Sequence, residues 1–156
     1  VVGTRRTPDA TPPPGFECVL PSTRLHELLG RSDYVAVCAQ YTPETEGLLS
    51  DEAFAALPEG AIIINVARGE VVDEAALLRA LGAGRLGGAA LDVYVGEFDH
   101  PPPSELWNHP KVLITPHTSA MSDVNQHRAV EVFCRNLSAY LAGEPLENVI
   151  DWSRGY

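Results

Sequence analysis

Short apolar runs that alternate with helical segments constrain the fold of this chain more than any other feature of its sequence. The runs 34–39 (YVAVCA) and 61–66 (AIIINV) are continuously apolar, which is typical of strands buried on both faces of a sheet. Three more strands are predicted over 1–3, 86–91 and 112–114. Helices are predicted over 23–29 after a Ser22 cap, over 51–57 after a Ser50 cap, and from Asp73 to Leu81.

A long final helix is predicted over 122–141. Its candidate buried positions are Val124, Ala129, Val132, Phe133, Leu137 and Leu141. The segments 8–15 (PDATPPPG) and 96–110 are predicted loops, because successive prolines remove backbone donors. The order of strands and helices predicts an α/β fold, a doubly wound parallel sheet with helices on both faces.

The composition argues against several classes of partner. The chain has 156 residues, and 21 acidic against 11 basic side chains give a formal net charge of −10. We therefore expect neither nucleic acid nor membrane as partner, since phosphate binding needs clustered Lys and Arg. No apolar run reaches membrane-spanning length and no signal peptide is visible, which predicts a cytoplasmic protein. The scattered Cys18, Cys38 and Cys134 predict buried thiols in a reducing compartment and no metal site.

The residues that directly follow the predicted strands are the candidates for a site, because ligands bind beyond the carboxyl ends of strands in such sheets. In chain order they are Arg5 and Arg6, Ala39 and Gln40, Ala67 and Arg68, Asp92, and His117. A single Arg or His in such a place is more often a solvated surface group. In combination, these residues predict that several ionisable groups converge on one edge of the sheet.

Linked motifs surround these residues. They read SDYVAV (32–37), TPETEGLL (42–49), LPEGAIIINVARGEVVDEAALLRAL (57–81), LGGAALDVY (86–94) and HPKVLITPH (109–117). In this order and context the chain resembles the D-isomer-specific 2-hydroxyacid dehydrogenase family. The resemblance implies a Rossmann-like fold and an oxidoreductase that transfers a hydride between NAD(P)H and a 2-oxo or 2-hydroxy acid, for example a glyoxylate or hydroxypyruvate reductase.

The resemblance also implies three catalytic residues. His117 is similar to the family's general acid/base, Glu97 to its carboxylate partner, and Arg68 to the residue that binds the substrate carboxylate. The chemistry agrees, because a forming alkoxide needs a proton donor that titrates near neutral pH and a planar guanidinium can bind a carboxylate bidentately. Contacts around the nicotinamide are implied for Val66, Ala67, Asp92, Thr118, Ser119 and Ala120.

Arg5 and Arg6 bear on the choice of cofactor. Family members that use NAD place an acidic residue at the end of this strand, for the ribose 2′-hydroxyl, whereas Arg accommodates a 2′-phosphate. We therefore predict NADP(H) in preference to NAD(H). Ala39 and Gln40 are expected beside the cofactor as well. Gln40 departs from the Pro of many family members, and Phe98 departs from the Pro that often follows the catalytic Glu.

No GxGxxG fingerprint lies between a first strand and its helix, although in the family it precedes a strand like 1–3. Gly82, Gly84, Gly87 and Gly88 are no substitute, because they follow a predicted helix or lie within a predicted strand. We therefore expect a partial dinucleotide-binding domain over 1–142, which lacks the first βα unit, and a tail over 143–156 that returns to an absent substrate domain. Strands 1–3 and 34–39 should then each lack a neighbour on one side, and the segment alone should fold poorly and turn over no substrate.

The state of assembly and one alternative function also come from the resemblance. Family members are commonly dimers, so a homodimer is expected. The alternative is a non-catalytic, dinucleotide-binding protein similar to the co-repressors of this fold. Retention of Arg68, Glu97 and His117 favours the enzyme.

Overall fold

The computed structural model describes residues 1–9 and 11–152, which fall into two compact units, one from Val1 to His117 and one from Thr118 onward. The first unit holds every strand of the described chain, and the second holds one long helix.

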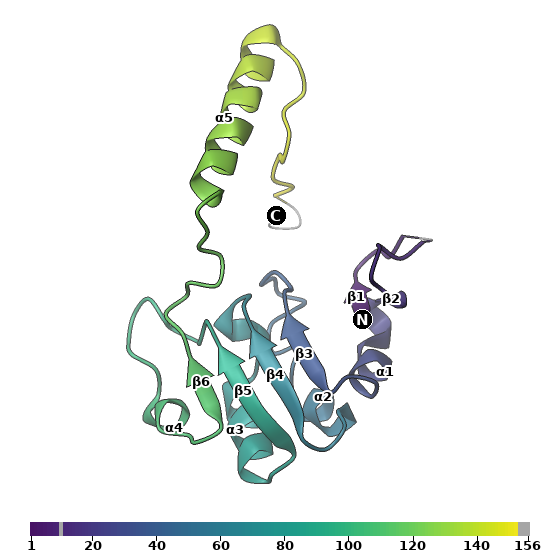
Figure 1. The fold of residues 1–156 in the computed structure, drawn as a ribbon, viewed down its shortest axis with the longest axis vertical. Helices are drawn as coiled ribbons and strands as arrows, with labels where there is room; N and C mark the ends of the chain where they lie inside the picture. The colour runs from purple at the N-terminus through teal and green to yellow at the C-terminus, as the bar shows by residue number, and fades with distance from the viewer. Residues whose placement is uncertain (10, 153–156) are drawn as a thin grey trace. The chain divides into compact units, whose positions relative to one another are not determined.

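The first unit contains two parallel sheets (Figure 1). In one, β1 (Val2–Arg5) pairs with β2 (Cys18–Pro21). The other has four strands in the order β3 (Tyr34–Val37), β4 (Ala61–Asn65), β5 (Leu86–Leu91) and β6 (Val112–Ile114). Every pair is parallel, which confirms the predicted α/β class. Strand β2 was not expected from the sequence, because it is short and follows the proline-rich loop directly.

Strands β1 and β3 each have one unpaired edge. Among the described residues no ladder of hydrogen bonds joins β1 to β3, so the strands divide into two sheets at this point. This confirms the prediction that strands 1–3 and 34–39 lack a neighbour on one side. The helix α1 (Leu25–Leu29) contacts β1, β2 and α2 (Asp51–Ala56) and so connects the two sheets by packing.

The predicted helix starts have mixed outcomes. Ser22 does not cap a helix, because a short 3-10 turn, η1 (Ser22–Arg24), precedes α1. Ser50 occupies the N-cap position of α2 without a side-chain hydrogen bond. Asp73 caps α3 (Glu74–Gly82) as expected, with its carboxylate accepting from the Ala76 N–H.

Two short helical turns were not expected from the sequence. The predicted loop 96–110 contains α4 (Ser104–Trp107), and the 3-10 turn η2 (Gly69–Val71) precedes α3.

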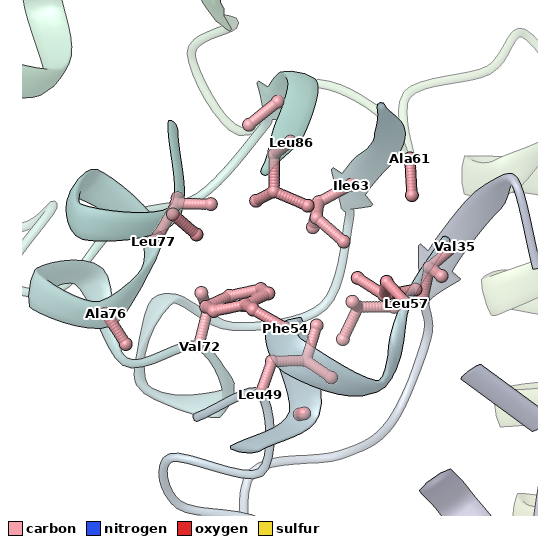
Figure 2. Close-up of a cluster of buried hydrophobic side chains, with 14 of the residues drawn as sticks. Val35, Leu49, Phe54, Leu57, Ala61, Ile63, Val72, Ala76, Leu77 and Leu86 are labelled. Carbon is pink, nitrogen blue, oxygen red and sulfur yellow. The ribbon is translucent and has the colours of Figure 1, made fainter. Parts of the chain in front are cut away.

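Apolar side chains from α2, α3 and the central strands form the core of the first unit, shown in Figure 2. Phe54, Ile63, Leu77 and Leu86 are almost fully buried there. Burial of such side chains contributes roughly 1.5–3 kcal/mol each. This packing fixes the positions of the strand ends that carry the site.

Strand β3 corrects one expectation. Val35 and Val37 are buried, but Tyr34 is 69% exposed and Ala36 is exposed, so the strand is buried on one face only. The covering helices α2 and α3 lie behind the strands in Figure 1, on one face of the sheet.

The cysteine prediction was also wrong, because Cys38 and Cys134 are exposed and only Cys18 is half-buried.

The second unit consists of α5 (Asn125–Ala142) and the segments that flank it. The predicted helix is confirmed and ends at Gly143, whose φ is 71°. None of the helix residues is buried, so the predicted burial of its apolar positions was wrong; Val132 alone of that set is half-buried. The physical reason is that the described part of this unit has no other helix or strand to cover them, and the segment after the helix is held to it by polar bonds from Arg135 and Asn136 to Glu147.

No described helix is both long and apolar enough to cross a bilayer. Across residues 1–9 and 11–152, His, Cys, Asp and Glu side chains form no cluster that could hold a metal ion.

Candidate active site

The carboxyl ends of the parallel strands carry most of the predicted site residues. Arg5 ends β1, Val66 follows β4, Asp92 follows β5, and His117 stands three residues beyond β6. Because these strands are parallel, their carboxyl ends meet at one edge of each sheet. The predicted residues of the first unit are thereby brought to the ends of neighbouring strands.

His117 and Glu97 are joined by a side-chain hydrogen bond. The Nδ1 atom of His117 lies 2.9 Å from Oε1 of Glu97. The Glu97 side chain is only 10% exposed and that of His117 is 32% exposed. A carboxylate on Nδ1 stabilises the imidazolium and fixes the ring orientation, which leaves Nε2 to exchange a proton. The exposed ring of Phe98 lies near the imidazole, with ring centroids 6.0 Å apart.

The backbone of His117 is held in an unusual conformation. Its φ is 51°, in the left-handed region, where His is tolerated better than most residues. Its N–H donates to the carbonyl oxygens of Asp92 at 2.9 Å and Thr115 at 3.0 Å. The position of the imidazole is therefore set by the end of β5 as well as by the chain that carries it.

Asp92 connects three strand ends. Its side chain is buried, its N–H donates to the carbonyl of Asn65 at 2.9 Å, and its carboxylate accepts from the Thr115 hydroxyl at 2.5 Å. With the His117 bond, these contacts link the ends of β4, β5 and β6. Thr115 did not stand out in the sequence, because a lone Thr before Pro has no distinctive pattern.

Arg68 lies on a tight turn shaped by Asn65. The Asn65 side chain is 1% exposed; its amide donates to the carbonyl of Arg68 at 2.9 Å, and its oxygen accepts from the Ala67 N–H at 3.0 Å. The Arg68 guanidinium is exposed and donates to the Ala67 carbonyl at 2.6 Å. Within the described residues the structure therefore does not join Arg68 to the Glu97–His117 pair. Asn65 was missed because it reads as the last residue of an apolar strand.

Arg5 and Arg6 present two exposed guanidinium groups at the end of β1. Arg5 pairs with Asp9 at 2.9 Å, and Arg6 lies 3.9 Å from Glu44. Such exposed ion pairs contribute little to stability, so an incoming phosphate can displace the carboxylates. Guanidinium groups are well suited to phosphate oxygens. At the end of β3, Ala39 is half-buried and Gln40 is exposed, and the Gln40 carbonyl accepts from the Thr45 hydroxyl at 2.6 Å.

Thr118, Ser119 and Ala120 belong to the second unit and are exposed there. The Thr118 carbonyl accepts from the Met121 N–H at 2.9 Å, and the Ala120 carbonyl accepts from the Asn125 side chain. Val66 and Ala67 belong to the first unit, where Val66 is 38% exposed at the end of β4.

Glu74 is a further polar group beside the site. Its Oε1 atom accepts from the N–H of Val95 at 2.8 Å. Burial raises the pKa of the Glu74 carboxyl; the Val95 N–H and the nearby His100 oppose the rise, and Glu70 adds to it. Glu74 did not stand out in the sequence, because an acidic residue in the first turn of a helix is common.

Comparison with known proteins places this geometry in a family. Residues 1–119 match the family described as D-isomer specific 2-hydroxyacid dehydrogenase, NAD binding domain. Among curated proteins, glyoxylate/hydroxypyruvate reductase A of Salmonella newport (strain SL254) is 37% identical over 143 residues, which cover 92% of this chain and 45% of the relative. The chain thus spans less than half the length of this curated relative.

Two solved structures are similar over 99% of this chain. One is a D-isomer specific 2-hydroxyacid dehydrogenase from Xanthobacter autotrophicus Py2 in complex with NADPH and MES, with 42% identity, a TM-score of 0.88 and 62% of that chain covered. The other is the NADPH-dependent glyoxylate/hydroxypyruvate reductase of Sinorhizobium meliloti in complex with NADP and sulfate, with 32% identity, a TM-score of 0.86 and 49% covered. The chain belongs to the D-isomer specific 2-hydroxyacid dehydrogenase family and has the Rossmann-like α/β fold of its NAD-binding domain.

Proposed function

We propose that the protein acts as an NADP(H)-dependent reductase of small 2-oxo acids, with glyoxylate and hydroxypyruvate as the first candidates. The observation that carries the proposal is the hydrogen bond between Glu97 and His117. The names of the similar reductases from Salmonella and Sinorhizobium support the choice of substrate class.

In this proposal the bound nicotinamide supplies the hydride that reaches the carbonyl carbon of the substrate. His117 donates the balancing proton from Nε2 to the carbonyl oxygen, and the product is the 2-hydroxy acid. Glu97 stabilises the imidazolium before the transfer. Arg68 binds the substrate carboxylate, for which its exposed position at the end of β4 leaves the guanidinium accessible.

Arg5 and Arg6 hold the 2′-phosphate of NADP(H) in this proposal, and Ala39 and Gln40 lie beside the adenosine half. By resemblance to the family, Val66, Ala67, Asp92, Ser119 and Ala120 are assigned to the nicotinamide half. Two exposed guanidinium groups at the end of β1 support the assignment. The complexes of the Xanthobacter and Sinorhizobium proteins with NADPH and NADP support it too.

We further propose a cytoplasmic homodimer. The boundary between a dinucleotide-binding domain over 1–142 and a tail over 143–156 also stays a proposal, and residues 153–156 of that tail lie outside the described residues.

The test is a steady-state assay of the full-length protein on a panel of 2-oxo acids with NADPH and NADH. We expect turnover of glyoxylate or hydroxypyruvate and a higher kcat/KM with NADPH. The double variant R5A/R6A should lose the NADPH preference while turnover with NADH persists. A protein that binds NADPH but reduces no 2-oxo acid would instead support the dinucleotide-binding, non-catalytic alternative.

A further inference from the structure

The loop that carries Glu97 touches the turn that carries Arg68. Gly69, directly after Arg68, lies against the backbone of Tyr94 and Val95, where a Cβ atom would come within 2.2 Å of the Tyr94 carbonyl carbon and 2.4 Å of the Val95 nitrogen. Only a glycine allows this approach without displacing one of the two segments. The two segments that bear proposed catalytic residues are thus in direct backbone contact.

Glu74 adds a hydrogen bond between α3 and the loop that carries Glu97. It is the first residue of α3, and its Oε1 atom accepts from the Val95 N–H at 2.8 Å. The helix start itself is fixed by the Asp73 cap on the Ala76 N–H. The carboxylate therefore projects from a rigid element onto the loop, two residues before Glu97.

The loop beyond Val95 is closed on itself. The Tyr94 hydroxyl donates to the His100 carbonyl at 2.8 Å, and the N–H groups of Asp99 and His100 donate to the Gly96 carbonyl. Gly96 has a φ of 73°, and the His100 ring occupies the space that a Cβ atom there would need. A displacement of Val95 is therefore transmitted to Glu97, because the loop between them has little freedom to absorb it.

We propose that Glu74 is a positioning residue, which anchors the loop 94–100 to α3 through the Val95 N–H and thereby holds Glu97 in register with His117. The inference rests on the proposed function of the Glu97–His117 pair, but it makes no assumption about the substrate. Glu74 touches neither substrate nor cofactor in this scheme and acts through Glu97.

The variants E74M and E74Q test the anchor in the full-length protein. Methionine keeps the approximate volume of the side chain and removes the acceptor, whereas glutamine keeps a carbonyl oxygen that can accept from Val95. The control is E52A, because Glu52 is an exposed first-turn acid of α2 and shares only the helix-dipole contribution with Glu74. Thermal unfolding of each variant reports whether the fold is intact.

We expect E74M to lower kcat for 2-oxo acid reduction by about 10- to 100-fold, since small displacements of a catalytic group have costs of this size. Its pH–rate profile should also change: the loss of rate on the alkaline side should move to lower pH, because a displaced Glu97 stabilises the imidazolium less. E74Q should restore both properties, and E52A should change neither. An E74M enzyme with reduced kcat and an unaltered pH profile would overturn the inference.

A readout without turnover separates this inference from the proposed function. In E74M the amide resonance of Val95 and the ring resonances of His117 should both differ from those of the wild-type protein, because the Val95 N–H has lost its acceptor. E74Q and E52A should leave both sets of resonances unchanged, and E74D, whose carboxylate is one methylene shorter, gives the same readout as E74M if E74M does not fold. If the Val95 resonance moves and the His117 resonances do not, the positioning role is wrong, whether or not the protein reduces any 2-oxo acid.

Discussion

The side-chain amide of Asn65 donates to the carbonyl oxygen of Arg68 at 2.9 Å, from a position that is 1% exposed. The same side chain accepts from the Ala67 N–H at 3.0 Å. One buried amide thus closes the turn that presents Arg68.

Replacing Asn65 with leucine should open this turn. The Ala67 N–H and the Arg68 carbonyl would lose their partners, at a cost of about 1–3 kcal/mol in the free energy of unfolding. Because Arg68 is proposed to bind the substrate carboxylate, KM for the 2-oxo acid should rise more than kcat falls. Chemical denaturation and steady-state kinetics check the two effects.

Asn108 offers the matched control. Its side-chain amide also donates to a backbone carbonyl, that of Ser104 at 2.9 Å, but it is exposed and lies at the end of α4. N108L should leave KM unchanged. Equal effects of N65L and N108L on KM would contradict the role given to the Asn65 turn.

His117→Ala should lower kcat by about 10²- to 10⁴-fold, the usual contribution of a general acid. Binding of NADPH, measured by fluorescence titration, should persist because the imidazole is proposed to act on the substrate oxygen. The control is H127A, since His127 also pairs with a carboxylate, Glu131 at 3.3 Å, but is 80% exposed on α5. An H117A protein with wild-type kcat would remove His117 from the mechanism.

Gly69→Ala should strongly destabilise the first unit. The added methyl group would collide with the backbone of Tyr94 and Val95, which cannot rotate away as a side chain can. Overpacking of this kind costs about 1–3 kcal/mol and sometimes more. Gly82, the last residue of α3, has no atom within 4 Å of a built Cβ, so G82A should be neutral or stabilising. Urea unfolding of both variants makes the comparison, and similar midpoints would show that the two segments are not in the contact described.

Glu74 should make stability depend on pH in a defined direction. Burial raises the pKa of its carboxyl above the unfolded value, so the folded protein binds the proton more tightly than the unfolded chain does. Between those two pKa values its contribution to stability falls as pH rises. The E74Q side chain does not titrate, so E74Q should gain stability relative to the wild-type protein as pH rises between the two pKa values. Thermal unfolding of both proteins across this pH range measures the difference in stability. A constant difference from pH 3 to pH 8 would contradict the shift.

The main strands and the start of α3 were predictable because the signals are local. Continuous apolar runs predicted β3 and β4, and the Asp73 cap predicted the start of α3, since capping depends on residues a few positions apart. Glu97 and His117 were paired only by family resemblance. Nothing in a separation of 20 residues predicts the 2.9 Å contact between them, which depends on where the loop after β5 turns back.

The missed features all depend on tertiary context. Strand β2 forms because β1 offers it a parallel partner, and its four residues have no periodic pattern of their own. Asn65 and Glu74 contact backbone groups of neighbouring segments, which leaves no trace in residue spacing. The apolar positions of α5 have the right periodicity for burial, yet periodicity identifies a face and says nothing of what covers it.

The unpaired edges of β1 and β3 have a consequence for hydrogen exchange. β4 lies between β3 and β5, and β5 lies between β4 and β6, so their amides are the most enclosed of the sheet. Exchange with deuterium should be slowest there and much faster in β1 and β3, where one edge has no ladder partner among the described residues. The Arg68 turn and Asp92 come directly after β4 and β5, whereas Arg5 is the last residue of β1. The two ends of the proposed dinucleotide site should therefore differ in local stability.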